Sequence, residues 1–136
     1  MNQIELKTYQ SIIEKTLQPF STFCIDFQGA TVSASGVVAK GYDPQGTLNK
    51  IRDALRLAFK QTNLPHTIDK RYVLKAAHST LIRFKRPLQQ PAKFAHFLED
   101  NRDFPFGKSK VTTIDLVYND WCMKAEKVQN FTTHHL

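Results

Sequence analysis

The stretch AAHSTLIRF, residues 76–84, decides how this sequence is interpreted. It lies within an extended segment, 73–84, whose apolar and β-branched residues predict a strand, and Pro87 ends that strand. Residues two apart on a strand point to the same face, so His78 and Thr80 are expected to project side by side. The strand therefore presents an imidazole and a hydroxyl on one surface.

Two helices and a β-hairpin are predicted before this strand. Residues 4–17 carry apolar side chains at spacings of three and four, which indicates an amphipathic helix. Residues 20–42 show an extended, alternating pattern that Gly29 interrupts, which is typical of a β-hairpin. A turn-rich segment follows, and residues 47–61 then repeat apolar positions with helical period.

Three more elements are predicted after it. Pro91 suits the first turn of a third helix, and residues 102–110 are expected to form a loop. Strands over 111–118 and 121–131 then make a second hairpin around residues 119–120. This order of elements predicts an α+β fold in which antiparallel sheets pack with helices.

Length and composition narrow the class of protein. A chain of 136 residues fits one packed core, so residues 1–136 are predicted to form a single domain. No run approaches the roughly 18 apolar residues that span a bilayer, and the polar N-terminal residues lack the order of a signal peptide. We therefore expect a cytoplasmic protein without membrane association. Two cysteines far apart in the sequence indicate neither a disulfide framework nor a zinc site.

The charge balance suggests a class of partner. The formal net charge of +7 favours an anionic ligand such as a nucleotide, a nucleic acid or a phosphate ester. The basic residues are spread along the chain, and a solvated face is the simpler explanation for them.

The five histidines are the candidates for acid/base chemistry near neutral pH. His78 and Thr80 suit phosphate chemistry, because an imidazole moves a proton while a hydroxyl donates a hydrogen bond to a non-bridging oxygen. The alternative for His78 is a core histidine whose ring is satisfied by hydrogen bonds. Among the others, His66 is expected in a turn, His96 on a half-buried helix surface, and residues 134–135 in a disordered tail.

The string AAHSTLIRF resembles the hydrophobic-His-x-Thr-Leu-x-Arg strand motif of the 2H phosphoesterase superfamily, which includes RNA 2′,5′-ligase-like enzymes and cyclic nucleotide phosphodiesterases. A second string, FGKSKVTTIDLVYNDWCM, is similar to the segment that follows the second His motif in that family. The resemblance covers roughly residues 4–131 and is strongest at 77–84 and 107–123.

The resemblance implies a pseudo-twofold fold in which two His-x-Ser/Thr motifs face each other across a cleft. One histidine acts as general base and the other as general acid, while the paired hydroxyls hold the phosphate without a metal or a cofactor. In this sequence the second-motif roles fall to His78 and Thr80 as catalytic residues. The resemblance assigns Arg83 either to binding of the substrate phosphate or to a structural contact.

This sequence lacks the first motif of that family. The motif is expected on a strand upstream of residues 4–17, and neither His66 nor His96 is followed two positions later by Ser or Thr. The chain is therefore interpreted as N-terminally incomplete or as having lost half of its catalytic pair. Loss of one of two acid/base groups costs about 10²- to 10⁴-fold in rate.

Three interpretations of function stay open. The first is a 2H-type phosphodiesterase-like domain, a hydrolase of RNA processing that acts on a cyclic phosphate or on a nucleotide or RNA 2′,5′-type phosphoester. The second is a non-catalytic nucleotide- or RNA-binding module that keeps the cleft and the positive charge. The third is a structural α+β domain in which the short motif is a coincidence. Because an absent first strand leaves an unpaired sheet edge, a homodimer is also predicted.

Overall fold

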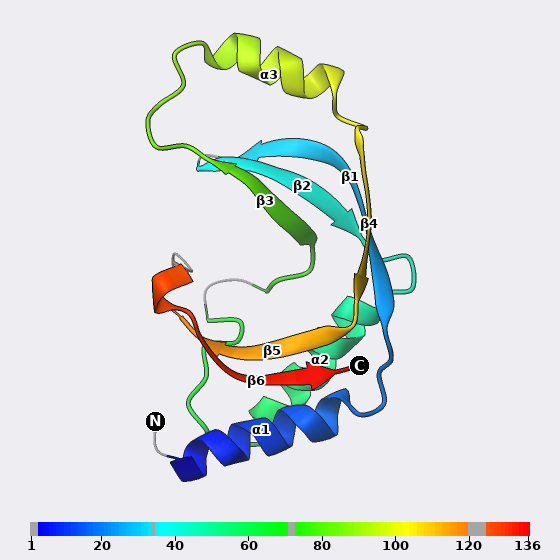
Figure 1. The fold of residues 1–136 in the computed structure, drawn as a ribbon, viewed down its shortest axis with the longest axis vertical. Coiled ribbons are helices and arrows are strands. Elements are labelled where there is room, and N and C mark those ends of the chain that lie inside the picture. Colours follow the sequence, from blue (N-terminus) through cyan, green and yellow to red (C-terminus); the bar gives the residue numbers. More distant parts are fainter. Residues whose placement is uncertain (1–2, 34, 71–72, 120–124) are drawn as a thin grey trace. The chain divides into compact units, whose positions relative to one another are not determined.

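The computed structural model describes residues 3–33, 35–70, 73–119 and 125–136. The chain has an α+β fold, as predicted (Figure 1). The helices are α1 (Gln3–Leu17), α2 (Thr47–Lys60), α3 (Pro91–Asp100) and the 3-10 helix η1 (Ala125–Lys127). The strands are β1 (Phe23–Ser33), β2 (Gly36–Tyr42), β3 (Ala77–Arg83), β4 (Pro105–Val111), β5 (Thr113–Tyr118) and β6 (Gln129–His135). Within the described residues, no helix has the length and apolar character needed to cross a bilayer.

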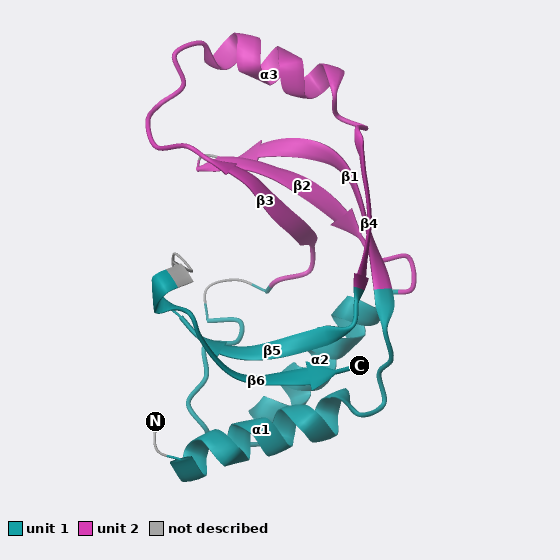
Figure 2. Cartoon of the chain, viewed as in Figure 1, with its two compact units in different colours: residues 1–23, 46–73, 111–136 teal, residues 24–45, 74–110 magenta. Residues whose placement is uncertain are grey.

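The chain forms two compact units, each assembled from segments that are distant in the sequence (Figure 2). Unit 1 contains residues 1–23, 46–73 and 111–136, and unit 2 contains residues 24–45 and 74–110. Neither unit is a continuous stretch, so no single cut in the chain would release one of them. The single domain predicted for residues 1–136 stays a prediction.

Unit 1 is built on helices α1 and α2, which pack together. The apolar stripe predicted on 4–17 is the side of α1 that is buried, through Ile13 and Leu17. Helix α2 contributes Ile51 and Phe59, which are also buried. Both helices therefore form for the reason that the sequence indicates, the burial of one apolar side.

The hairpin of unit 1 differs from its prediction. Strand β5 lies within the predicted 111–118, but its partner β6 begins at Gln129 instead of lying over 121–131. The disordered tail predicted for the last histidines is wrong, because His134 and His135 pair with Ile114 and Thr113 in an antiparallel ladder. Residues 120–124, on which the predicted turn and part of the predicted strand fall, lie outside the described residues.

Unit 2 contains a four-stranded sheet with the strand order β3-β2-β1-β4. The interruption predicted at Gly29 is wrong: β1 continues through this residue as a β-bulge, and the hairpin closes where Ser33 pairs with Gly36. Gly29 has a φ of +77°, and a Cβ there would lie 2.0 Å from the carbonyl oxygen of Arg102. The glycine therefore permits the close approach of another segment and does not end the strand.

Strand β4 is a second correction, because residues 102–110 were predicted to form a loop. The segment lacks the alternating apolar pattern of a half-buried strand, and all residues of β4 except Val111 are exposed. It lies beside β1, and the backbone N–H of Gly29 donates a hydrogen bond to the carbonyl of Phe104 at 2.8 Å. Backbone pairing, which composition does not reveal, makes this segment a strand.

Helix α3 begins at Pro91 as predicted, with the proline in its first turn. It buries Leu98, and its Phe94 ring contacts the Phe84 ring edge-on with centroids 5.9 Å apart. An aromatic contact therefore packs Phe84, the first residue after β3, against α3.

Candidate functional site

His78 and Thr80 lie on β3, at one edge of the four-stranded sheet. Strand β3 pairs antiparallel with β2, and His78 stands opposite Lys40 while Thr80 stands opposite Val38. Directly opposed residues of an antiparallel pair share a face of the sheet. The pairing therefore confirms that His78 and Thr80 lie on one face, and it adds Lys40 to that face.

A β-bulge brings Arg83 to the same face. Arg83 lies five positions after His78, so strict alternation places them on opposite faces. The register shifts by one residue between these positions, with Val37 opposite Ile82 and Gly36 opposite Arg83, which leaves Leu81 as the extra residue on β3. A bulge of this kind re-aims the side chains that follow it. His78, Thr80 and Arg83 consequently project from one face.

Gly36 makes room for this bulge. A Cβ at Gly36 would lie 2.0 Å from the carbonyl oxygen of Ile82, a distance that no side chain tolerates. Glycine therefore allows the backbone of β3 to approach β2 closely at the point where the register changes.

We call the surface that carries His78 the His78 face and define it from the strand register. It contains Asp26, Thr31, Ser33, Gly36, Val38, Lys40, Tyr42, His78, Thr80 and Arg83. Most of these side chains carry hydroxyl, carboxylate or cationic groups. The opposite face holds Ile25, Val37 and Ala39, which are buried. One side of the sheet is thus the core side and the other is polar.

The three predicted site residues are open to solvent. His78, Thr80 and Arg83 are exposed, and Lys40 is half-buried. An exposed imidazole on the polar side of the sheet is not a core histidine, so that alternative for His78 is wrong. No cluster of three His, Cys, Asp or Glu suited to a metal ion exists in the part of the chain that the structure describes.

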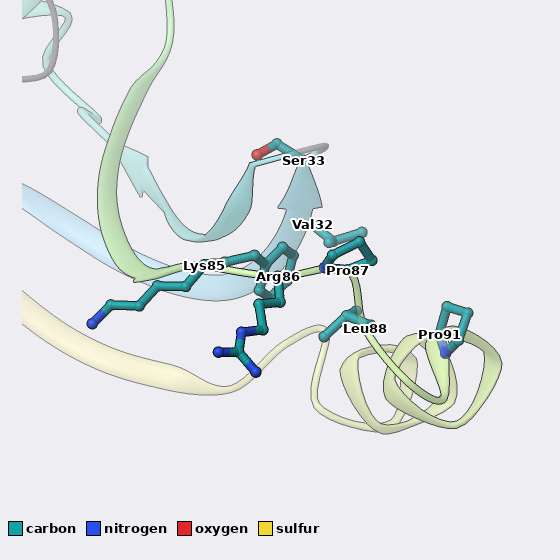
Figure 3. A pocket seen from close by; sticks show the side chains of 8 residues that line it. Val32, Ser33, Lys85, Arg86, Pro87, Leu88 and Pro91 are labelled. Carbon is teal, nitrogen blue, oxygen red and sulfur yellow. The ribbon is translucent and has the colours of Figure 1, made fainter.

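An open depression of about 580 Å³ lies at the Arg83 end of the sheet (Figure 3). Its lining residues come from the end of β1, from the segment after β3 and from the start of α3: Val32, Ser33, Phe84, Lys85, Arg86, Pro87, Leu88 and Pro91. The lining is mainly apolar, and the Lys85 and Arg86 side chains extend from the segment that follows β3. Ser33 belongs both to this depression and to the His78 face.

The other histidines have different surroundings. His66 packs edge-on against the Phe59 ring with centroids 5.9 Å apart, so it belongs to the apolar side of α2. His96 is exposed on α3 with its Nε2 3.6 Å from a carboxylate oxygen of Asp100, and the expected half-buried surface is therefore wrong. Neither histidine is followed two positions later by Ser or Thr, as His78 is by Thr80.

Arg56 of α2 forms ion pairs within the fold. Arg56 donates hydrogen bonds to Asp69 at 2.8 Å and to Asp53 at 2.7 Å. These bonds, the Asp69 one first, raise the pKa of the Arg56 guanidinium. Burial, followed by repulsion from Arg56, lowers the pKa of the neighbouring Arg52. Arg56 thus ties the segment after α2 to the helix.

Sequence reasoning missed Lys40 as a member of the site. The alternation in VVAKGY assigns Lys40 to the polar side of its strand, but the sequence does not show which residue of another strand stands opposite it. The pairing of β2 with β3 supplies that information.

Comparison with known proteins adds no assignment. No protein-family model matches the chain. A search of curated proteins likewise finds no match.

Proposed function

We propose that the His78 face binds the phosphate of a nucleotide or RNA phosphoester and that His78 is an acid/base group of a 2H-type phosphodiesterase reaction. The observation that carries the proposal is the register of β2 and β3. It gathers one imidazole, one hydroxyl and two cationic side chains on a solvent-exposed face, from His78, Thr80, Arg83 and Lys40. Convergent donors of this kind are what a phosphate group requires.

Each side chain has a distinct task in this proposal. Hydrolysis of a 2′,3′-cyclic phosphate adds water across one P–O bond, so the attacking water loses a proton and the leaving ribose oxygen gains one. His78 carries out one of these two proton transfers. Thr80 donates a hydrogen bond to a non-bridging oxygen, and Arg83 and Lys40 balance the charge that grows there.

The same arrangement supplies half of a catalytic pair. Among the described residues of the His78 face, His78 is the one histidine. Water then replaces the second acid/base group, which lowers the rate by about 10²- to 10⁴-fold. The second candidate, a non-catalytic nucleotide- or RNA-binding module, uses the same four side chains and differs only in having no turnover.

The deciding experiment measures opening of a 2′,3′-cyclic nucleotide by the 136-residue chain, with affinity for the same nucleotide measured in parallel. The proposal expects slow hydrolysis that His78→Ala abolishes, and binding that survives better than turnover. Ser79→Ala is the matched control, because Ser79 is adjacent on β3 but stands opposite the buried Ala39 on the other face.

The possible outcomes separate the interpretations. Binding without hydrolysis in both the wild type and His78→Ala supports the binding module. Fast wild-type hydrolysis that His78→Ala leaves intact means that the chemistry lies elsewhere in the chain. Absence of binding in the folded protein contradicts the phosphate site as a whole and supports a structural domain with a coincidental motif.

Location and assembly follow as parts of the same proposal. A substrate from RNA processing favours the cytoplasm.

Strand β3 is an edge strand on which Leu81 and Ile82 are 45% and 49% exposed, and such an edge offers unpaired backbone groups to a second copy of the chain. Light scattering coupled to gel filtration tests the homodimer: a monomeric mass over the accessible concentration range contradicts it.

A further inference from the structure

We propose that the depression at the Arg83 end of the sheet is a docking site for an acidic peptide segment of a partner protein, one that carries large apolar side chains between its carboxylates. This inference goes beyond the proposed phosphate site and does not depend on it. None of the four side chains assigned to the phosphoester lines the depression.

The apolar lining of the depression lies on the side of the sheet opposite to His78. Val32, which lines it, stands directly opposite Val37 of β2, and Val37 is 2% exposed on the core side. Phe84, another lining residue, packs edge-on against Phe94 of α3. A ligand in the depression and a ligand on the His78 face therefore occupy different surfaces.

The described part of the chain leaves this apolar surface open to solvent. Val32 is 47% exposed and Ile82 is 49% exposed, although both stand opposite Val37 on the core side. Pro87 and Pro91, which also line the depression, are exposed as well. The depression has a volume of about 580 Å³. An apolar side chain that enters it removes these groups from water, which is the main source of affinity between proteins.

Two cations determine the charge of the partner. Lys85 and Arg86 line the depression and are exposed, and neither forms an ion pair with any residue that the structure describes. Figure 3 shows both side chains extending from the segment that also carries Pro87 and Leu88. Carboxylates beside an apolar anchor complement this arrangement, because protein interfaces combine an apolar centre with a polar rim of matching charge.

Other occupants fit the depression less well. The chain carries 19 Lys and Arg against 12 Asp and Glu, so the cationic rim repels a second copy. Bases of single-stranded nucleic acid stack on aromatic side chains, whereas the apolar lining is aliphatic except for Phe84, whose ring already contacts Phe94. Anionic membranes attract clusters of about four to eight cations, and the depression supplies two.

The first test selects ligands from a phage-displayed library of random peptides on the immobilised 136-residue chain. We expect the enriched peptides to share large apolar residues flanked by acidic ones. They should not bind the variant Lys85→Glu/Arg86→Glu. Failure to enrich any peptide above an unrelated immobilised protein overturns the proposal, and so does enrichment of peptides without acidic residues.

A synthetic peptide of the enriched sequence then measures the role of the two cations by fluorescence titration at about 0.15 M ionic strength. Lys85→Glu/Arg86→Glu should weaken binding at least about tenfold, because two attractive pairs become repulsive. The same peptide with lysine at each acidic position should instead bind this variant more tightly than the wild type.

The matched control is Lys108→Glu/Lys110→Glu. It makes the same change in net charge on two exposed lysines of β4 that do not line the depression. Peptide affinity should change less than about twofold, because exposed charges outside the contact are screened. An equal loss in both double variants indicates attraction by the net charge alone and overturns the docking site.

Pro91→Glu tests the apolar lining separately. Pro91 lies in the first turn of α3, where a glutamate is favourable, so the helix should form, and circular dichroism checks this. The new carboxylate enters the depression and should weaken peptide binding about tenfold, whereas His78→Ala should leave it unchanged. Undiminished binding to folded Pro91→Glu contradicts the assignment. So does binding of single-stranded oligonucleotides or anionic vesicles through Lys85 and Arg86 when no peptide binds there.

Discussion

Lys40 and His78 stand directly opposite each other on β2 and β3, so an ammonium group and an imidazole share one face of the sheet. The position of Lys40 depends on a neighbour on its other side, since a Cβ at Gly29 would lie 3.0 Å from Lys40 Cε. The bulge at Gly29 thus leaves space for the aliphatic part of Lys40. Two bulges, one in β1 and one in β3, therefore shape the same polar surface.

Replacement of Lys40 tests whether its charge serves a ligand. Lys40→Gln keeps most of the aliphatic stem and removes the ammonium, so we expect a loss of about 0.5–1.5 kcal/mol in binding of a cyclic nucleotide, with fold stability unchanged. Titration calorimetry at low and high salt measures it, and the loss should shrink as salt screens the charge. Equal affinity of the variant and the wild type at low salt argues against a role for Lys40.

Replacement of Thr80 removes one hydroxyl with little change of shape. Thr80→Val should weaken binding by about 0.5–1.5 kcal/mol if the hydroxyl bonds a neutral oxygen, and by about 1.5–3 kcal/mol if the oxygen is charged. Since Thr80 is exposed, thermal unfolding should show little change in stability. A variant that unfolds earlier but binds as tightly as the wild type would assign Thr80 to the fold.

The core of unit 1 gives a prediction about stability alone. Phe59 is 5% exposed and contacts the Tyr9 ring with centroids 5.8 Å apart, so Phe59→Ala should cost about 3–5 kcal/mol in the free energy of unfolding. Leu57→Ala is the control, because Leu57 lies on the same helix but is 60% exposed and should cost well under 1 kcal/mol. Urea unfolding of the two variants checks the difference.

The sequence predicts the elements that bury one apolar side, because this burial leaves a periodic apolar pattern in the sequence. The stripe that ends at Ile13 and Leu17 and the periodic positions of 47–61 both indicate helices, and both helices are present. Strand β4 was missed because its residues are mostly exposed and only its backbone pairing makes it a strand. The strand of the last histidines is hidden from the sequence for a related reason, because it exists through pairing with β5.

The candidate site also has a part that the sequence predicts and a part that depends on strand pairing. The i, i+2 spacing places His78 and Thr80 on one face, and the structure has them there. Arg83 is different, because a regular strand puts it on the opposite face, and its position depends on the extra residue Leu81. A bulge is a property of two strands together, so AAHSTLIRF alone does not contain it.

Two single-residue deletions in β3 test this account of the bulge. Leu81 is the residue without a partner on β2, so its deletion should convert the bulge into a regular ladder with Thr80 opposite Val38, Ile82 opposite Val37 and Arg83 opposite Gly36. All three site residues then stay on the His78 face. Nucleotide affinity should remain within about threefold of the wild type, because the deletion removes only the bulge and the half-exposed Leu81 side chain.

Deletion of Ser79 removes a paired residue from the same strand and serves as the matched comparison. A one-residue slip moves the side chains on one side of the deletion to the other face, so His78 and Thr80 can no longer project together. Binding through the His78 face should fall to background even if the sheet still forms, which circular dichroism and thermal unfolding establish for both variants. If the two deletions weaken binding equally while both proteins stay folded, the register of β3 does not determine the site, and the grouping of Arg83 with His78 is contradicted.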